Sequence, residues 1–342
     1  MSGDTPRPGS RAGVQLGRPS RRLLVAGGAA VALTALSGCG LRLDLPQPPP
    51  PVPTRKPAPD ERFILAVIAD LRALVRAAEA LEPKGDDRRL VRAIVAVQRR
   101  QIAVLTGRLT NAGVPTAEIA KATAPTPSST PTTSAPTSGT AGGSTTAPTP
   151  GGPPDVTSIR TVDDLAATLA TIAPDRWKAL AATTQGTRDL VLVAWSSRLA
   201  AAVLLGENVD PTTTPSAARP RIIEQTSPLV YGFEVAAAQS TGARRTRALE
   251  TLDELRRLDL AVAGPTTATP GGWALPFPVT TPAQAQRLAT HLLGTAVDAT
   301  VDVAGSKPDG PALDDTARWS GRVQSLAVDW GMPLAPFPGT AT

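Results

Sequence analysis

Apolar residues recur every three or four positions in the long segments of this 342-residue chain. This spacing matches the 3.6-residue period of an α-helix, whereas a half-buried strand alternates with period two. No segment shows sustained period-two alternation, so we predict an all-α fold without a sheet. Over residues 61–82 the apolar side of the predicted helix consists of Ile64, Val67, Ile68, Leu71, Leu74, Val75, Ala78 and Leu81.

Proline, glycine and capping residues divide the helical segments from one another. A second helix is predicted from Asp86 to about Leu109 after the break at Pro83, so the first two helices form an antiparallel hairpin. Thr281-Pro-Ala-Gln284 is a strong start signal, with a capping hydroxyl, proline at the first helical position and glutamine at the third. The other helices are predicted at about 162–173, 174–184, 187–206, 221–240, 243–263, 282–304 and 311–331.

The first 38 residues have the composition of a secretory signal peptide. A head with five arginines precedes an apolar run over residues 23–36, which ends in small residues. A helix of fourteen residues at ~1.5 Å each is about 21 Å long, short of the ~30 Å hydrocarbon core. We therefore predict a segment that is removed after export and does not span the membrane.

Leu36-Ser37-Gly38-Cys39 resembles a lipobox, the motif read by the enzymes that process bacterial lipoproteins. The resemblance implies a diacylglycerol on the Cys39 sulfur and cleavage before this residue. Cys39 is the only cysteine of the chain, so an intrachain disulfide is excluded. The predicted location is the extracytoplasmic face of the cell membrane, with acyl chains such as palmitate holding the protein there.

Arg21 and Arg22, within Ser20-Arg-Arg-Leu-Leu24, resemble the twin-arginine export signal. That route carries proteins that are already folded. An ordinary secretory signal whose basic head contains two adjacent arginines is the other interpretation. The sequence leaves the choice between these export routes open.

The charge of the chain changes when the signal is removed. The whole chain has 35 Lys and Arg against 29 Asp and Glu, and its first 38 residues hold five Arg and one Asp. The mature chain then carries 30 basic against 28 acidic side chains, a net charge of +2. No basic stripe with interleaved aromatic residues is present, so nucleic acid is not a predicted partner.

Two segments of low complexity lie outside the predicted helices, one after the signal peptide and one between helical segments. Residues 39–59 are rich in proline, which favours an extended, semi-rigid tether. Residues 124–154 contain only Ala, Pro, Ser, Thr and Gly, a composition that cannot bury enough apolar surface to fold. We predict disorder over 112–156, as a bare linker or one that carries O-linked sugar.

Three motifs in the second half resemble the ferritin-like domain of unknown function found in actinobacterial lipoproteins. They are Leu229-Val-Tyr-Gly-Phe-Glu-Val-Ala-Ala-Ala-Gln239, Trp273-Ala-Leu-Pro-Phe-Pro-Val-Thr-Thr-Pro-Ala283 and Trp330-Gly with Phe337-Pro-Gly339. The resemblance covers about residues 220–339, and residues 60–206 are more loosely similar to the helices that precede this domain. It implies a ferritin-like four-helix bundle, or two in tandem, over regions 60–207 and 220–342, and assigns no activity.

A di-iron site of the ferritin type requires two Glu-x-x-His motifs. The chain has one histidine, His291, and no Glu-x-x-His. Gln98 and Gln101 stand where acidic or histidine ligands would be expected, and we interpret them as hydrogen-bonded residues of the bundle. We predict no cofactor; an all-carboxylate metal site is the alternative, with the candidate ligands Glu79, Glu224, Glu234 and Glu254.

The sequence contains no set of residues that indicates catalysis. It has neither a Gly-x-Ser-x-Gly elbow nor a glycine-rich phosphate loop. We therefore favour a non-catalytic binding or scaffolding lipoprotein, with membrane lipid and an envelope protein or small ligand as partners. The alternatives are the metal or redox protein and a carrier of an apolar small molecule. The five tryptophans, at positions 177, 195, 273, 319 and 330, are expected to anchor the core. Of these, Trp273 is the candidate for contact with a ligand or partner, together with Tyr231.

Overall fold

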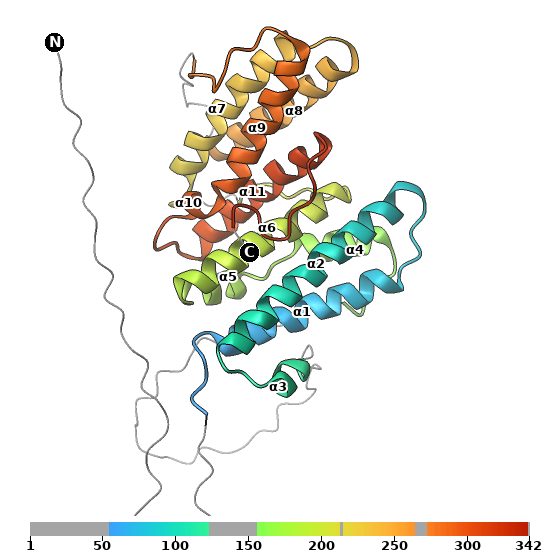
Figure 1. Cartoon of the computed structure of the whole chain (residues 1–342), viewed down its shortest axis with the longest axis vertical. Coiled ribbons are helices and arrows are strands. Elements are labelled where there is room, and N and C mark those ends of the chain that lie inside the picture. The colour runs from blue at the N-terminus through green and yellow to red at the C-terminus, as the bar shows by residue number, and fades with distance from the viewer. Residues whose placement is uncertain (1–54, 123–155, 213–214, 264–271, 341–342) are drawn as a thin grey trace, which may run out of the picture. The chain divides into compact units, whose positions relative to one another are not determined.

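The computed structural model describes residues 55–122, 156–212, 215–263 and 272–340 (Figure 1). All regular secondary structure in these ranges is helical, which confirms the predicted all-α class. Residues 55–342 form one compact unit, so regions 60–207 and 220–342 belong to the same body. The signal peptide, the export motif, Cys39 with its lipobox and most of the tether lie outside the described residues.

The helices begin and end close to the predicted positions. The capping boxes of Thr161 with Asp164 and of Thr281 with Gln284 are both formed. The helix predicted over 282–304 is interrupted at Ala299, and the helix around Pro228 continues through this proline. The bounds are α1 Glu61–Ala80, α2 Gly85–Asn111, α3 Thr116–Ala120, α4 Val162–Ala170, α5 Pro174–Ala181, α6 Gln185–Leu204, α7 Arg219–Ala238, α8 Gly242–Ala263, α9 Pro282–Asp298, α10 Thr300–Ala304 and α11 Gly310–Asp329.

The short helix α3 lies inside the range 112–156, for which we predicted disorder, so this prediction was wrong at its beginning. Val114 and Ile119 are almost fully buried, at 2% exposure each. The guanidinium of Arg72 donates to the carbonyl oxygens of Ile119 and Ala122, at 2.7 and 3.0 Å. Two apolar side chains and one arginine thus hold this segment against α1.

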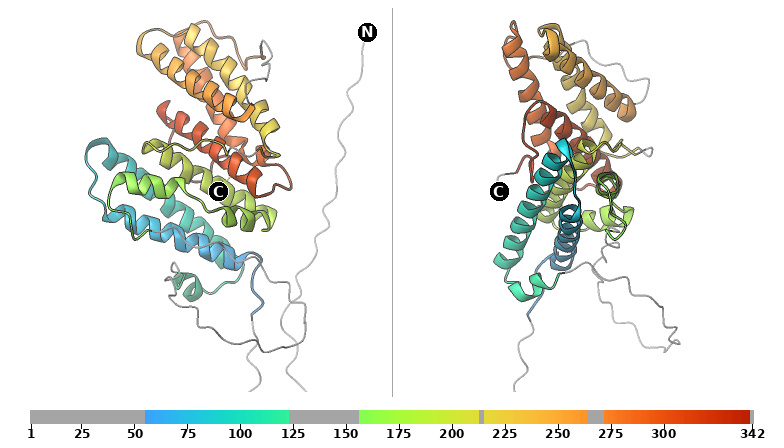
Figure 2. Two further views of the ribbon diagram at one scale, coloured as in Figure 1. Left: turned by 180° about the vertical axis from the view of Figure 1, so that it is seen from behind. Right: turned by 90° about the vertical axis from the view of Figure 1, so that its right-hand side faces the viewer.

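The described helices enclose two main hydrophobic cores. The first is built by α1, α2, α4, α5 and α6, and the second by α7, α8, α9 and α11. Helix α11 serves both, because Leu313 and Ala317 enter the first core while Trp319 and Val323 enter the second. In Figures 1 and 2, α6 and α11 lie between the α1–α2 hairpin and the group of α7, α8 and α9.

Helices α6 and α11 approach each other closely at Gly321. A Cβ atom at this position would lie 2.9 Å from Leu199 Cβ, 3.1 Å from Ala200 N and 3.2 Å from Ser196 O. These distances are shorter than ordinary van der Waals contacts, so only glycine fits without movement of α6. The contact joins the two cores through the backbones of their neighbouring helices.

Buried charged groups also connect the helices of the first core. Asp70 on α1 and Arg176 on α5 form an ion pair in which each side chain is 5% exposed. The Arg198 guanidinium donates to the carbonyl oxygens of Thr168, Leu169 and Thr171 at 2.6–3.0 Å, at the C-terminal end of α4. Helix C-termini attract cations, so Arg198 caps α4 from α6. Burial nevertheless lowers the pKa of Arg198 to about 10.

In the part of the chain that the structure describes, no helix combines the length and apolar character needed to cross a bilayer.

Candidate functional site

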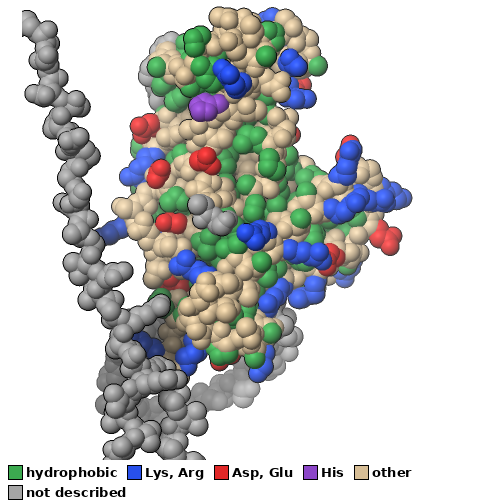
Figure 3. Space-filling view, viewed as in Figure 1, with side chains coloured by type: hydrophobic (Ala, Val, Ile, Leu, Met, Phe, Trp, Pro, Cys, Tyr) green, Lys and Arg blue, Asp and Glu red, His purple; other side chains and the backbone are tan. Residues whose placement is uncertain are grey.

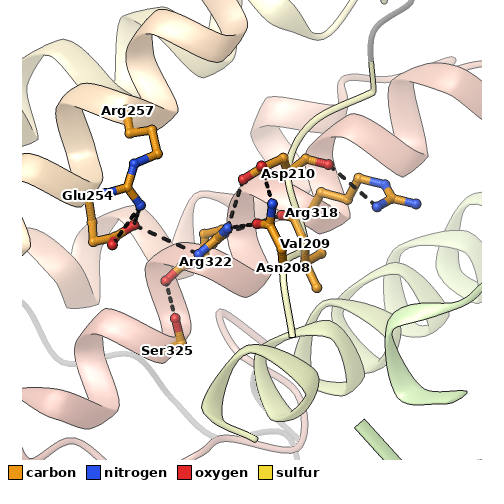
Figure 4. Close-up of polar contacts among 8 residues, drawn as sticks. All are labelled: Asn208, Val209, Asp210, Glu254, Arg257, Arg318, Arg322 and Ser325. Carbon is orange, nitrogen blue, oxygen red and sulfur yellow. Dashed lines mark hydrogen bonds and ion pairs between the residues drawn. The ribbon is translucent and has the colours of Figure 1, made fainter. Parts of the chain in front are cut away.

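A polar pocket of about 410 Å³ opens where the segment after α6 meets α8 and α11. Its walls include Asn208 and Asp210 from that segment, Glu254 and Arg257 from α8, and Arg322 from α11. Figure 4 shows Arg322 between the two groups, with Glu254 on one side and Asn208 and Asp210 on the other.

Arg322 makes most of the polar contacts of the pocket. Its guanidinium donates to Asp210 Oδ1 at 2.7 Å, to Asn208 Oδ1 and to the Val209 carbonyl oxygen at 3.3 Å. Its other terminal nitrogen lies 3.8 Å from Glu254 Oε2. The side chain is 17% exposed, so these contacts are partly shielded from water.

The carboxylates around Arg322 outnumber the guanidiniums. Arg257 donates to both oxygens of Glu254 at 2.8 Å. Partial burial raises the pKa of the Asp329 carboxyl above its ordinary value, and the positive charge of Arg247 opposes this shift. The four carboxylates among the lining residues belong to Glu207, Asp210, Glu254 and Asp329.

This arrangement lacks the geometry of nucleophilic catalysis. Ser325 is the only hydroxyl among the residues that line the pocket, and it donates to the Arg322 carbonyl oxygen at 2.7 Å. No lining residue is a histidine that could act as its base. The pocket is therefore a structural junction in which one arginine ties the 208–210 segment and α8 to α11. Nothing in the spacing of the sequence indicated this junction.

Tyr231 and Trp273, the expected ligand contacts, lie together in the structure. Their ring centroids are 5.9 Å apart with the planes tilted by 48°, and both side chains are half-buried. Further along the same loop, the centroid of the Phe277 ring lies 4.2 Å from the Arg287 guanidinium carbon, a cation–π contact. Trp273 thus places one part of the described loop against α7, and Phe277 places another part against α9.

The prediction that the tryptophans anchor the core is confirmed for Trp177, Trp195, Trp319 and Trp330, but not for Trp273, which is only half-buried. Trp177 and Trp195 meet edge to face, with ring centroids 4.9 Å apart. The indole nitrogen of Trp319 donates to Thr226 Oγ1 at 2.9 Å, and that of Trp330 donates to Thr251 Oγ1 at 3.0 Å. All four side chains are at most 6% exposed.

Gln98 and Gln101 are both buried on α2, at 2% and 1% exposure. Gln101 Nε2 donates to the carbonyl oxygens of Pro336 at 2.8 Å and Ala194 at 3.3 Å. Ser197 and Gln324 donate to the Ala335 carbonyl at 2.5 and 3.1 Å. The predicted hydrogen bonding is therefore correct for Gln101, which fixes the C-terminal segment. It is wrong for Gln98, whose polar atoms contact no donor or acceptor of the described residues.

Replacing Gln101 with alanine should release the C-terminal segment and lower the free energy of unfolding by about 1–3 kcal/mol. The reason is that Pro336 O loses its buried donor. Denaturant titration measures the stability, and limited proteolysis reports whether the segment around Phe337 becomes accessible. The exposed Gln286→Ala serves as the control and should change stability by less than about 0.5 kcal/mol. Equal stability of the two variants would contradict the role assigned to Gln101.

The four glutamates considered as metal ligands are not brought together. Glu79 pairs with Arg99, Glu234 with Arg256 and Glu254 with Arg257. Glu224 is exposed on α7, and the lone His291 is exposed on α9. Within the described ranges, no three acidic or histidine side chains are placed to hold a metal ion. The all-carboxylate site drawn from these glutamates therefore has no support in their geometry.

Comparison with known proteins gave no relative. No protein-family model matches the chain, and neither the curated proteins nor the solved structures contain a match.

Proposed function

We propose that this chain is a lipid-anchored protein of the cell envelope whose helical body binds or scaffolds a partner at the extracytoplasmic face of the membrane. The single observation that carries this proposal is the order of its N-terminal features. A basic head and an apolar run end in Leu36-Ser-Gly-Cys39, which contains the only cysteine of the chain. The compact unit begins sixteen residues later, at Arg55.

The buried charged groups of the helical body join its helices to one another, and this supports a binding or scaffolding role. Asp70 with Arg176 connects α1 to α5, and Arg198 caps α4. Asp315, which is fully buried, accepts from the backbone and hydroxyl groups of Thr212 at 2.9 Å and from Arg219 at 3.1 Å. Each of these groups holds helices or segments together, as expected for a rigid platform.

The ferritin-like interpretation is part of the proposal. Four long helices, α7, α8, α9 and α11, share the second core. We propose that they form a ferritin-like four-helix bundle and that α1, α2, α4 and α6 form a related one. In the bundle of α1, α2, α4 and α6, the buried Gln98 and Gln101 stand where the resemblance would lead us to expect acidic or histidine ligands.

The pair of Trp273 and Tyr231 is the surface that we assign to the partner. Half-buried aromatic residues combine a large apolar area with few rotatable bonds, which favours binding. Trp273 and Tyr231 therefore form the proposed contact.

Cell fractionation with detergent-phase partition tests the anchor. The wild-type protein should enter the membrane fraction and the detergent phase, because two or three acyl chains on one residue give stable attachment. Cys39→Ser should lose this partition, whereas the neighbouring Gly40→Ser, which retains the thiol, should keep it. Partition of Cys39→Ser into the detergent phase equal to that of the wild type would refute the lipid anchor.

A further inference from the structure

The solvent face of α2 is unusually rich in arginine. From Arg88 to Asn111 this helix has six arginines and no acidic residue. At about 100° per residue, Arg88, Arg92 and Arg99 lie within about 40° of one another around the helix axis, and Arg100 lies about 80° beyond Arg92, still on the exposed side. Figure 3 shows Lys and Arg side chains, in blue, along the helices of the hairpin on the visible face.

Several of these guanidiniums have no carboxylate partner among the residues that the structure describes. Arg99 pairs with Glu79, and Arg89 pairs with Asp86 at the start of the helix. Arg88 and Arg92 donate only to the carbonyl oxygens of Pro83 and Arg88, at 3.1 and 3.2 Å. Arg100 is exposed and forms no ion pair with any described residue. The face therefore carries positive charge that the folded body does not neutralise.

An apolar groove runs beside these arginines. A groove of about 660 Å³ lies between the end of α1 and the first half of α2. Leu81, Val91 and Val95 contribute to its apolar wall, and Arg88 and Arg92 lie at its edge. A phospholipid surface has its phosphate groups above an apolar layer of acyl chains. Here the phosphates would meet the guanidiniums, and the acyl chains would meet the apolar wall of the groove.

We propose that the solvent side of α2, through Arg88, Arg92 and Arg100, and the adjoining groove bind the surface of an anionic phospholipid bilayer. The guanidiniums contact the phosphates, and the groove receives the first methylene groups of an acyl chain. The inference rests on the proposed function, because the lipid on Cys39 would hold the helical body at the membrane surface.

The length of the chain permits this contact. Fifteen residues lie between Cys39 and Arg55, so sixteen residue-to-residue steps join them. At a maximum of about 3.6 Å per residue they span at most about 58 Å. The 20 residues of α1 extend for about 30 Å, so the groove at its far end lies within reach of an anchor in the same bilayer.

Vesicle sedimentation tests the proposal with residues 40–342 produced without leader or lipid. This form contains the whole compact unit of residues 55–342, and its binding does not depend on modification of Cys39. Vesicles of phosphatidylglycerol mixed with phosphatidylcholine should bind the protein at low salt. Vesicles of phosphatidylcholine alone should not bind it, and about 0.5 M salt should weaken binding to the anionic vesicles.

The decisive variant removes three unpaired charges. Arg88→Gln, Arg92→Gln and Arg100→Gln together should weaken binding about one hundredfold, since each arginine near an anionic surface contributes about fivefold. The control triple Arg244→Gln, Arg245→Gln and Arg247→Gln removes the same charge from exposed positions of α8 and should retain binding. Thermal melting should be the same for all three proteins.

Other results would overturn the proposal. They are equal binding to neutral vesicles, an equal loss in the α8 triple, or binding to the soluble polyanion dextran sulfate without binding to anionic vesicles. Because this protein carries no lipid, these failures differ from failure of the anchor, which would leave Cys39 unmodified in the cell.

Discussion

Arg176→Ala is expected to lower the free energy of unfolding by about 3–5 kcal/mol, the largest effect of any substitution considered. The change leaves the Asp70 carboxylate buried without its partner, and an uncompensated buried charge is strongly destabilising. Denaturant titration at pH 7 measures the loss. Arg256→Ala breaks the pair with Glu234, whose side chains are 53% and 46% exposed, and should cost at most about 1 kcal/mol.

The pH dependence of the Arg176→Ala variant provides a second test. Burial already raises the pKa of Asp70 in the folded protein, and Arg176 opposes this shift. Without the arginine, the folded-state pKa of Asp70 rises further above its unfolded value. A raised folded pKa contributes stability that is present below the unfolded pKa and is lost as the pH rises through the folded pKa. The variant should therefore be less destabilised at pH 4 than at pH 7; an equal loss at both would show that Asp70 is not the buried charge left behind.

Gly321→Ala is expected to destabilise the protein by about 1–3 kcal/mol, because the added methyl group overpacks the contact between α6 and α11. It would lie 2.9 Å from Leu199 Cβ and 3.1–3.2 Å from two backbone atoms of α6, which cannot rotate away. Thermal and denaturant unfolding measure the effect.

Gly107→Ala on α2 is the matched control for this prediction. No other atom lies within 4 Å of a Cβ built at Gly107, so the methyl group meets open space. Alanine is the better helix former, and this variant should gain about 0.5–1 kcal/mol. If Gly321→Ala were equally stabilised, α6 and α11 would not be in the close contact described.

The helices could be predicted from the sequence because their signals are local. Spacings of three and four residues located α1, and the capping boxes of Thr161 and Thr281 marked the starts of α4 and α9. The break at Ala299 and the short helix α3 were missed. Their stability comes from contacts with other helices, which no local pattern records.

The polar contacts of the interior could not be predicted for the same reason. Gln101 is separated from its partner Pro336 by 235 positions, and Arg322 from Asn208 by 114. Trp273 and Tyr231 were each named as candidate ligand contacts, but neither their proximity nor the cation–π contact between Arg287 and Phe277 was predicted. Such pairs depend on how the helices pack, which the periodicity of each helix leaves open.

The central claim, a lipid on Cys39, is tested most directly by mass spectrometry of the N-terminal peptide of the protein purified from the cell envelope. We predict that the mature chain begins at Cys39 and that this residue carries the mass of a diacylglyceryl group. A chain that begins at another residue, or an unmodified Cys39, would contradict the proposed anchor.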